Sequence, residues 1–294
     1  MKEITLVVIY NKQIEESSTI RSLIVSNYTG DLYIFNNGPS EVNFSSSFIA
    51  LLQSKYNCVK IVEDVNNRPL SNIYNDFLNV DGYDNYYLFD DDTTIPSKFF
   101  ELEKRIGYDL SLPKIYSSRT GDIVYPIVNK NIISENDFSF HENDEVISIG
   151  SGLMINKSLI HKFEAIGIKP FDERFALYGV DYSLFRRLPF LKCAGYTVNI
   201  GIAGNLHHSL SSEDGNISAF RKRERLIDLV LTKLHYSRRK WPLKPISILK
   251  TLIQQVIKKD FRNLKILLGV CLRQEHPRST QYKNHLKNNN NTKI

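Results

Sequence analysis

Residues 86–92, with the sequence YYLFDDD, join a buried-strand pattern to a run of acids. The apolar and aromatic part predicts a strand, which ends abruptly at Asp90, Asp91 and Asp92. Three carboxylates this close repel one another, so ionising all of them is costly unless a positive charge lies among them. A hard divalent cation, Mg²⁺ or Mn²⁺, prefers such oxygen ligands and often bridges to a phosphate. The alternative is a solvated acidic turn without a ligand.

Strand and helix patterns alternate from the N-terminus up to this stretch. They predict four strands and three helices, at residues 4–10, 14–27, 31–35, 48–52, 58–62, 72–78 and 86–89. This order predicts right-handed βαβ units and a parallel sheet. We therefore expect an α/β fold with a mostly parallel, Rossmann-like central sheet flanked by helices.

Polar residues follow several of the predicted strands directly. Asn11 follows the first strand, Asn36 and Asn37 follow the second, and the three aspartates end the fourth. In open parallel sheets, ligands bind outside the carboxyl ends of the strands. We therefore expect these side chains to gather at one edge of the sheet.

The second half of the chain contains three more segments of interest. Residues 147–155 predict a strand interrupted by glycines, which allow a bulge or the close approach of a ligand. Residues 158–166 predict a helix, and a further helix begins near Asp181, which is placed either to cap it or to act in chemistry. A late strand at 195–200 leads to His207 and His208.

Composition sets outer limits on the class of protein. A chain of 294 residues with 42% hydrophobic content can bury a large core, as one domain or one domain with an extension. No apolar run reaches the roughly 18 residues of a membrane span, and the strand-like start leaves no room for a signal peptide. Three dispersed cysteines predict neither a disulfide framework nor a zinc site, and favour a reducing cytosol.

The net charge of +6 conceals a strong segregation. Residues 220–294 hold 19 Lys and Arg against 4 Asp and Glu, a net charge of +15, which leaves −9 on the first 219 residues. Helical patterns occur at 220–234 and 261–272, and between them an apolar stripe is flanked by lysines. From residue 276 onward, Asn and Lys dominate, and we expect disorder. The expected domains are 1–215, 216–275 and a tail of 276–294.

Five segments, in order over residues 4–210, carry a resemblance to a known family. They are VVIYN (7–11), YIFNNG (33–38), LFDDD (88–92), FDE to YGVD (171–181) and HSL (208–210). Together they resemble family 2 nucleotide-sugar glycosyltransferases of the GT-A type, especially the bacterial rhamnosyltransferase-like group of surface-polysaccharide synthesis. The chain departs from the family pattern at Asn36, often Asp; Val180, often Glu; Ser183, often an acid; and Ser211, often Gly.

The resemblance implies an enzyme that transfers a sugar from a nucleoside diphosphate to an acceptor hydroxyl with inversion. Asp90 and Asp92, with Asp91 as a further candidate ligand, would hold the divalent cation, and His208 would complete its shell or contact the diphosphate. Asp181 would be the base, although Asp172 and Glu173 remain alternatives.

The resemblance also implies a nucleotide site. Tyr10, Asn11 and Asn37 would frame the nucleobase and ribose, with Asn67 and Asn75 as weaker matches to asparagines of the family. Arg186 and Arg187 could reach phosphate, although we interpret them as exposed helix charges. Deoxythymidine diphosphate-rhamnose is the first donor expected from the resemblance, and uridine diphosphate sugars are the second.

The acceptor implied by the resemblance is a glycan, often carried by a lipid. Residues 220–273 could then lie on the anionic inner face of the cell membrane, which predicts a cytoplasmic, peripheral protein. The apolar stripe could instead pack internally or form a homodimer.

Two other classes of protein compete with this interpretation. A sugar nucleotidyltransferase usually has a glycine-rich loop after its first strand, and Asn11-Lys12-Gln13-Ile14 has none. A nucleic-acid-binding protein would use the basic segment, but this segment has few aromatic residues for base stacking. We therefore expect no nucleic acid partner.

Overall fold

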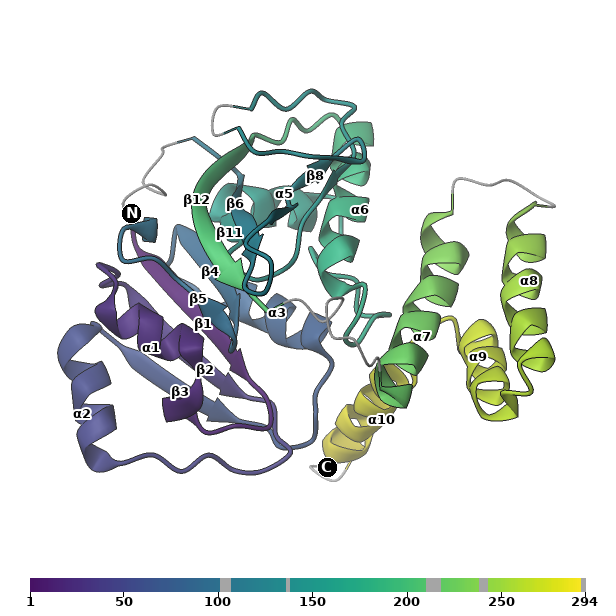
Figure 1. The fold of residues 1–294 in the computed structure, drawn as a ribbon, viewed down its shortest axis with the longest axis horizontal. Helices are drawn as coiled ribbons and strands as arrows, with labels where there is room; N and C mark the ends of the chain where they lie inside the picture. Colours follow the sequence, from purple (N-terminus) through teal and green to yellow (C-terminus); the bar gives the residue numbers. More distant parts are fainter. Residues whose placement is uncertain (101–106, 136–137, 210–217, 238–242, 292–294) are drawn as a thin grey trace. The chain divides into compact units, whose positions relative to one another are not determined.

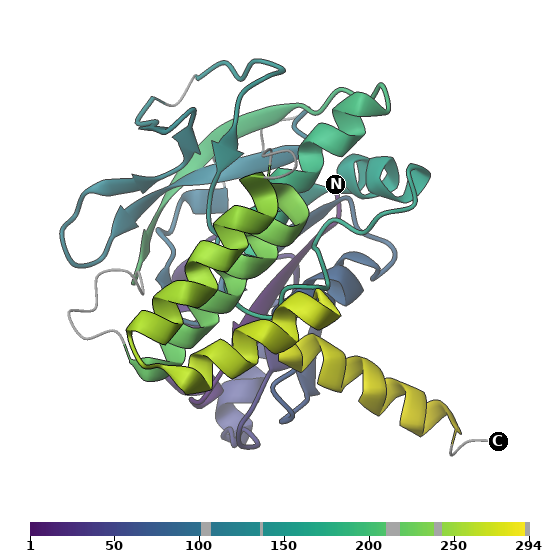
Figure 2. The ribbon, with the colours of Figure 1, turned by 90° about the vertical axis from the view of Figure 1, so that its right-hand side faces the viewer.

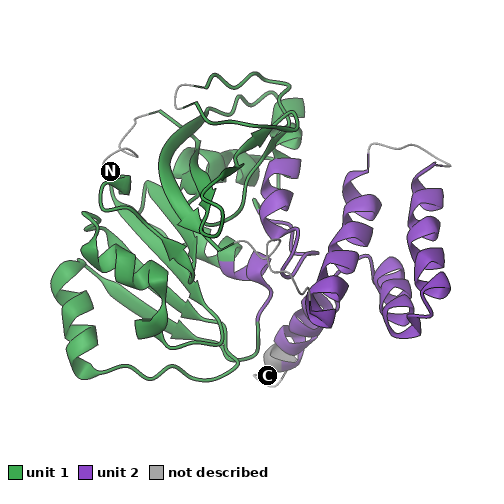
Figure 3. Ribbon diagram, viewed as in Figure 1, with its two compact units in different colours: residues 1–67, 74–170, 187–213 green, residues 68–73, 171–186, 214–294 purple. Residues whose placement is uncertain are grey.

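The computed structural model describes residues 1–100, 107–135, 138–209, 218–237 and 243–291. The chain forms two compact units, drawn in Figure 3: the first contains residues 1–67, 74–170 and 187–213, and the second contains 68–73, 171–186 and 214–294. The expected domains of 1–215, 216–275 and 276–294 stay a prediction, because compactness alone assigns no function to a unit.

The first unit is built on one large sheet (Figure 1). Among the described residues this sheet has nine strands: β1 Glu3–Ile9, β2 Asp31–Asn36, β3 Val59–Glu63, β4 Asn85–Asp90, β5 Thr93–Thr94, β6 Leu110–Ser117, β7 Ile123–Tyr125, β11 Met154–Asn156 and β12 Ile200–His208. Their order is β3-β2-β1-β4-β11-β6-β12-β5, with β7 beside β6. The first four strands are parallel, and β11 runs antiparallel between β4 and β6. The expectation of an α/β fold with a mostly parallel sheet is confirmed.

Helices cover both faces of the parallel part of the sheet. In the described parts of the chain, the helices between the strands are η1 Ile14–Glu16, α1 Ser18–Val25, α2 Ser46–Lys55, α3 Leu70–Leu78, α5 Lys157–Ala165 and α6 Val180–Cys193. Ile34 of β2 lies in the same core cluster as Leu23 of α1 and Leu52 of α2. The next side chain along, Tyr33, points to the opposite face and contacts Phe77 of α3 edge to face. Burial on both faces explains why these strands are continuous apolar runs in the sequence.

The predicted strand at residues 147–155 is two strands in the structure. Val146–Ile147 is β10, in a small sheet with β8 (Ile127–Val128) and β9 (Asn131–Ile132), whereas β11 belongs to the large sheet. The turn between them contains Gly152, whose φ is +85° and whose Cβ, if it had one, would lie 2.1 Å from Leu206 Cδ1. The glycine therefore permits a turn packed closely on β12 and not a continuous strand.

The late strand also differs from its expected place. Residues 195–199 precede β12, and the strand itself runs from Ile200 to His208. It pairs parallel with β6 and antiparallel with β5, where His208 lies opposite Thr93. This pairing carries the end of β12 to the acidic end of β4.

The second unit ends in four helices, which Figure 2 shows most clearly: α7 Ala219–Tyr236, α8 Leu243–Ile257, α9 Phe261–Arg273 and α10 Pro277–Asn291. We expected disorder from residue 276, whereas the structure has α10 there. Its start is anchored on α7, because Glu224 accepts hydrogen bonds from His276 Nε2 at 3.1 Å and Arg278 Nη2 at 2.8 Å. Within the described parts of the chain, no helix is both long and apolar enough to cross a bilayer.

Candidate functional site

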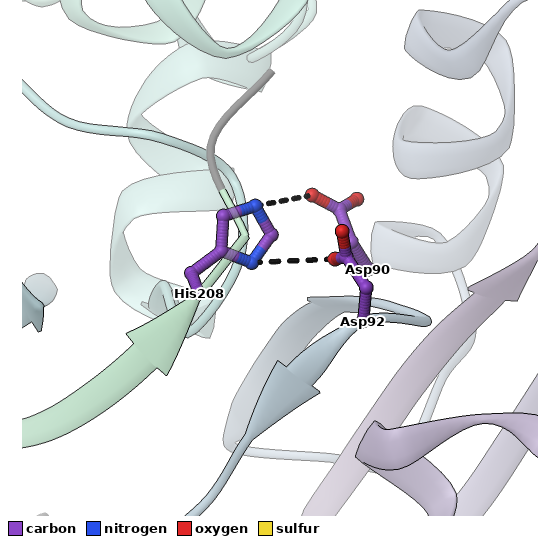
Figure 4. A group of neighbouring side chains, drawn as sticks. All are labelled: Asp90, Asp92 and His208. Atoms are coloured by element: carbon purple, nitrogen blue, oxygen red, sulfur yellow. Dashed lines mark ion pairs between the residues drawn. The ribbon is translucent and has the colours of Figure 1, made fainter. Parts of the chain in front are cut away.

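Three side chains that could hold a metal meet at the carboxyl edge of the large sheet (Figure 4). Asp90 ends β4, Asp92 follows it, and His208 ends β12. One ligand atom from each lies within 4.8 Å of the other two. His208 Nδ1 is 3.4 Å from Asp92 Oδ1, and its Nε2 is 3.9 Å from Asp90 Oδ2. Two motifs that lie far apart in the sequence therefore form one group.

His208 is suited to act as an uncharged ligand. The residue is 7% exposed, and burial lowers the pKa of its imidazole below the ordinary 6.5, while Asp92 and Asp91 oppose that shift. At neutral pH the ring is therefore mainly uncharged, and one nitrogen has a lone pair to offer.

Two buried hydroxyls connect His208 to the backbone of the acidic triplet. His208 Nδ1 is 2.9 Å from Thr93 Oγ1, which lies 2.5 Å from Ser151 Oγ. Ser151 Oγ in turn accepts a hydrogen bond from the Asp90 N–H at 3.2 Å. Sequence reasoning missed both hydroxyl residues, because only the pairing of β12 with β5 and the turn before β11 bring them behind the histidine.

Asp91 faces away from that group and toward the end of β1. Its Oδ1 pairs with Lys12 Nζ at 2.7 Å, and its Oδ2 accepts a hydrogen bond from the Tyr10 N–H at 3.0 Å. Burial raises the pKa of Asp91 above its ordinary value, although Lys12 and the Tyr10 amide oppose the shift. Sequence reasoning missed Lys12 as well.

The start of α1 holds the backbone of the acidic triplet. Ser17 Oγ caps α1 by accepting from the Ile20 N–H and donates to the Asp91 carbonyl at 2.8 Å. Thr19 Oγ1 donates to the Asp90 carbonyl and accepts from the Thr93 N–H at 2.9 Å. The run Ser17-Ser18-Thr19 is a helix-start signal in the sequence. The hydrogen bonds from its hydroxyls to the backbone of the acidic triplet depend on the fold and could not be predicted from that signal.

The ends of β1 and β2 meet as the parallel sheet predicts. Asn11, with φ of +54°, donates its N–H to the Gly38 carbonyl at 2.7 Å, and the Asn37 N–H donates to the Ile9 carbonyl at 2.8 Å. Asn36 is used within its own turn, since its amide donates to the Ser40 carbonyl and its oxygen accepts from the Gly38 N–H. Roles in nucleotide binding stay predictions for these residues.

The other residues proposed for the nucleotide differ in their accessibility. Tyr10, directly after β1, is 46% exposed and is therefore accessible to a ligand. Asn37 is buried, Asn67 adopts a positive φ of 52° in the loop after β3, and Asn75 lies buried within α3. Their roles in nucleotide binding stay predictions.

The candidate bases lie in the second unit and differ sharply in environment. Asp181 is in the first turn of α6 and is partly exposed. Asp172 is 1% exposed, and its carboxylate is held by Arg174 Nη2 at 2.6 Å and by the Tyr236 hydroxyl at 2.5 Å. Ser183 Oγ accepts from the Asp172 N–H, so this serine supports the same buried network. Glu173 is partly exposed.

The two arginines of α6 are engaged with the protein. Arg186 is not the exposed charge that we expected: its guanidinium lies over the rings of Tyr182 and Tyr236 and 3.9 Å from Asp228. Burial lowers its pKa from the ordinary value. Arg187 donates from Nη1 to the Lys169 carbonyl.

Among known proteins, the chain resembles solved structures in its fold. No protein-family model and no curated sequence matches the chain. The structure of S. aureus TarS matches with a TM-score of 0.52 and 12% identity, over 83% of this chain and 41% of TarS. The structure of TarS 1–349 in complex with UDP-GlcNAc matches with a TM-score of 0.50 and 12% identity, over 83% of this chain and 69% of that one. The structure of GalNAc-T7 with UDP, GalNAc and Mn²⁺ matches with a TM-score of 0.50 and 11% identity, over 78% of this chain and 48% of that one.

These neighbours are GT-A glycosyltransferases, and the chain shares their fold. It spans about two fifths of the length of the TarS structure. At identities this low, the likeness concerns the fold alone.

Proposed function

We propose that this protein is a metal-dependent glycosyltransferase that moves a sugar from a nucleoside diphosphate to a hydroxyl of an acceptor. The observation that carries the proposal is the group of Asp90, Asp92 and His208, at the carboxyl edge of a GT-A sheet. Ligands bind at this edge in folds of this kind.

The residues present fit a divalent cation such as Mn²⁺ or Mg²⁺. Two carboxylates and an uncharged imidazole converge, which is a donor set suited to Mn²⁺. Asp92 Oδ1 is buried and, among the described residues, accepts no hydrogen bond. A bound cation would satisfy this atom and relieve the repulsion between the two aspartates.

Asp90, Asp92 and His208 would hold the cation, which as a Lewis acid would stabilise charge on the departing diphosphate. His208 would bind it through Nε2, with its Nδ1–H donated to Thr93 Oγ1. This second contact selects the tautomer and fixes the plane of the ring.

Asp181 would remove the proton from the acceptor hydroxyl as that oxygen attacks the anomeric carbon, and direct displacement would invert that centre. The environment of Asp172 supports this choice. A carboxylate already held by Arg174 and Tyr236 is poorly placed to accept a further proton.

The nucleotide would lie along the ends of β1 and β2, where Tyr10 offers an exposed ring and Asn11 and Asn37 stand at neighbouring strand ends. Asn67 and Asn75 would complete this part of the site, while Asp91 would hold the end of β1 in place through Lys12 and the Tyr10 amide. A pyrimidine nucleoside diphosphate sugar is the donor class that we propose. The family resemblance favours deoxythymidine diphosphate-rhamnose, and the structural neighbours TarS and GalNAc-T7 are in complex with UDP-GlcNAc and with UDP, respectively.

The finer placement of the enzyme rests on the resemblance and on the charge of its C-terminal part. We place it in family 2, in the rhamnosyltransferase-like group that makes O-antigen or capsule. Its acceptor would be a lipid-linked glycan at the cytoplasmic face of the cell membrane, which the basic segment of residues 220–273 would contact.

A thermal-shift screen tests the donor class. The ligands are UDP, deoxythymidine diphosphate and the corresponding nucleoside diphosphate sugars, each added once with Mn²⁺ and once with a chelator. The proteins are the wild type, Asp92→Asn and the control Asp122→Asn, which alters an exposed loop acid. We expect stabilisation only with Mn²⁺, lost in Asp92→Asn and kept in Asp122→Asn, because only a bound ligand raises the unfolding free energy. Equal shifts in chelator would contradict the proposal, and pyrophosphate release from a nucleoside triphosphate and a sugar phosphate would favour a nucleotidyltransferase.

A further inference from the structure

Helix α8 is oriented opposite to the usual pattern of a surface helix. Its polar residues Thr251 and Gln255 are 2% and 3% exposed. Lys233 of α7 donates to Thr251 Oγ1 at 2.6 Å and to the Ser247 carbonyl at 3.0 Å, so the polar side is tied to the neighbouring helix. The outward side carries six large apolar side chains that are 47–74% exposed: Leu243, Ile246, Leu249, Ile253, Val256 and Ile257.

These six residues, which we call the α8 stripe, repeat at helical spacing along the whole helix. A stripe of this kind is normally buried, because water is a poor solvent for a continuous apolar surface. The neighbouring helix α9 adds exposed Phe261, Leu268 and Leu272, although its Leu267 is buried. Figure 2 shows α9 following α8 through a short turn. The stripe therefore requires a partner with an apolar interior.

The charge around the stripe indicates which partner. Residues 243–274 contain seven Lys and Arg and a single acid, Asp260. Asp260 caps α9, since its Oδ1 accepts from the Asn263 N–H at 3.1 Å. A second copy of the chain would set this strongly positive surface against itself, whereas anionic lipid headgroups would complement it.

We propose that the α8 stripe is the surface by which the protein binds an anionic phospholipid membrane, with α8 lying in the plane of the headgroups. A helix of 15 residues is too short to span a bilayer, and an amphipathic helix in this orientation buries its apolar face at the boundary between headgroups and acyl chains. Lys250, Lys258 and Lys259 would meet the phosphates. The purpose of this surface rests on the proposed function, in which the acceptor is lipid-linked, but the binding itself does not.

Sedimentation with vesicles tests the proposal on the full chain without any nucleotide sugar. We expect binding to phosphatidylcholine vesicles that contain phosphatidylglycerol and much weaker binding to phosphatidylcholine alone, because each basic residue near an anionic surface adds about fivefold to the partition constant. Added salt should weaken the binding. The double variant Ile253→Gln/Ile257→Gln should bind at least about tenfold more weakly, since two inserted side chains are lost.

The matched control is Val25→Gln, which changes a side chain in α1 that is 71% exposed and distant in sequence. This control should bind vesicles like the wild type, and both variants should keep the wild-type circular dichroism and melting temperature. Absence of vesicle binding, or equal binding by the double variant, would overturn the proposal. A wild-type dimer that the double variant dissociates would assign the stripe to a second copy. Donor hydrolysis in solution tests the proposed function separately, because it requires no membrane.

Discussion

The ammonium group of Lys12 lies 2.7 Å from Oδ1 of Asp91, and this pair separates the middle acid of the triplet from its two neighbours. Asp90 and Asp92 gather with His208, whereas Asp91 joins the end of β4 to the end of β1. One short motif thus serves two purposes, because the chain turns at Asp91 and Asp92, directly after β4 ends at Asp90.

The Lys12–Asp91 pair predicts a loss of donor affinity without a loss of metal. In Asp91→Asn and Lys12→Met, the end of β1 loses a charged contact, so we expect the KM for the nucleotide sugar to rise about tenfold. The affinity for Mn²⁺, measured by isothermal titration, should stay near the wild-type value. If Asp91→Asn loses Mn²⁺ as completely as Asp92→Asn does, Asp91 is itself a ligand.

Thr93 predicts a contribution to metal affinity from outside the ligand set. Thr93→Val removes the hydroxyl that orients His208 while keeping the shape of the side chain, so the affinity for Mn²⁺ should fall about tenfold. Thr93→Ser keeps a hydroxyl and should retain most of the affinity. Equal affinities in all three proteins would mean that His208 needs no such support.

The meeting of Asn11, Asn37 and Asp91 could be predicted from the sequence, because buried parallel strands have continuous apolar patterns and their carboxyl ends share an edge. The positions of Thr93 and Ser151 could not. They depend on the antiparallel pairing of β12 with β5 and on the turn at Gly152, where the same apolar pattern suits one strand or two.

The C-terminal helices show a second limit of sequence patterns. The stripe on α8 predicted an amphipathic helix, but periodicity does not say which face a protein covers, and Thr251 and not Ile253 is buried. The composition after residue 276 suggested disorder, because the contacts of His276 and Arg278 with Glu224 are distant in sequence.

The two aspartates of the second unit should respond differently to the same substitution. Asp181→Asn should lower glycosyl transfer by about 10²–10⁴-fold with an unchanged melting temperature, because it removes a base. Asp172→Asn should lower the free energy of unfolding by about 2–4 kcal/mol, because it leaves Arg174 without its buried partner. Turnover and thermal unfolding of both variants separate the roles, and full activity in Asp181→Asn would remove it as the base.

The anchor of α10 predicts a pH-dependent stability. Burial alone would raise the pKa of Glu224, but hydrogen bonds and charge from His276 and Arg278 lower it below the ordinary 4.5. A carboxyl whose pKa is lower in the folded state stabilises that state above its unfolded pKa, and the contribution disappears as the pH falls through the folded value. The difference in unfolding free energy between the wild type and Glu224→Gln should therefore be largest near neutral pH and shrink below about pH 4.5. Urea denaturation across this range measures it, and a constant difference would contradict the assignment.

Hydrolysis of a nucleoside diphosphate sugar by the wild type and by Asp92→Ala, each with Mn²⁺ and with a chelator, tests the central claim most directly. The wild type should be active only with Mn²⁺, and Asp92→Ala should lose at least about 100-fold of that activity, since the cation stabilises charge on the leaving group. Wild-type rates in Asp92→Ala under chelation would contradict the account.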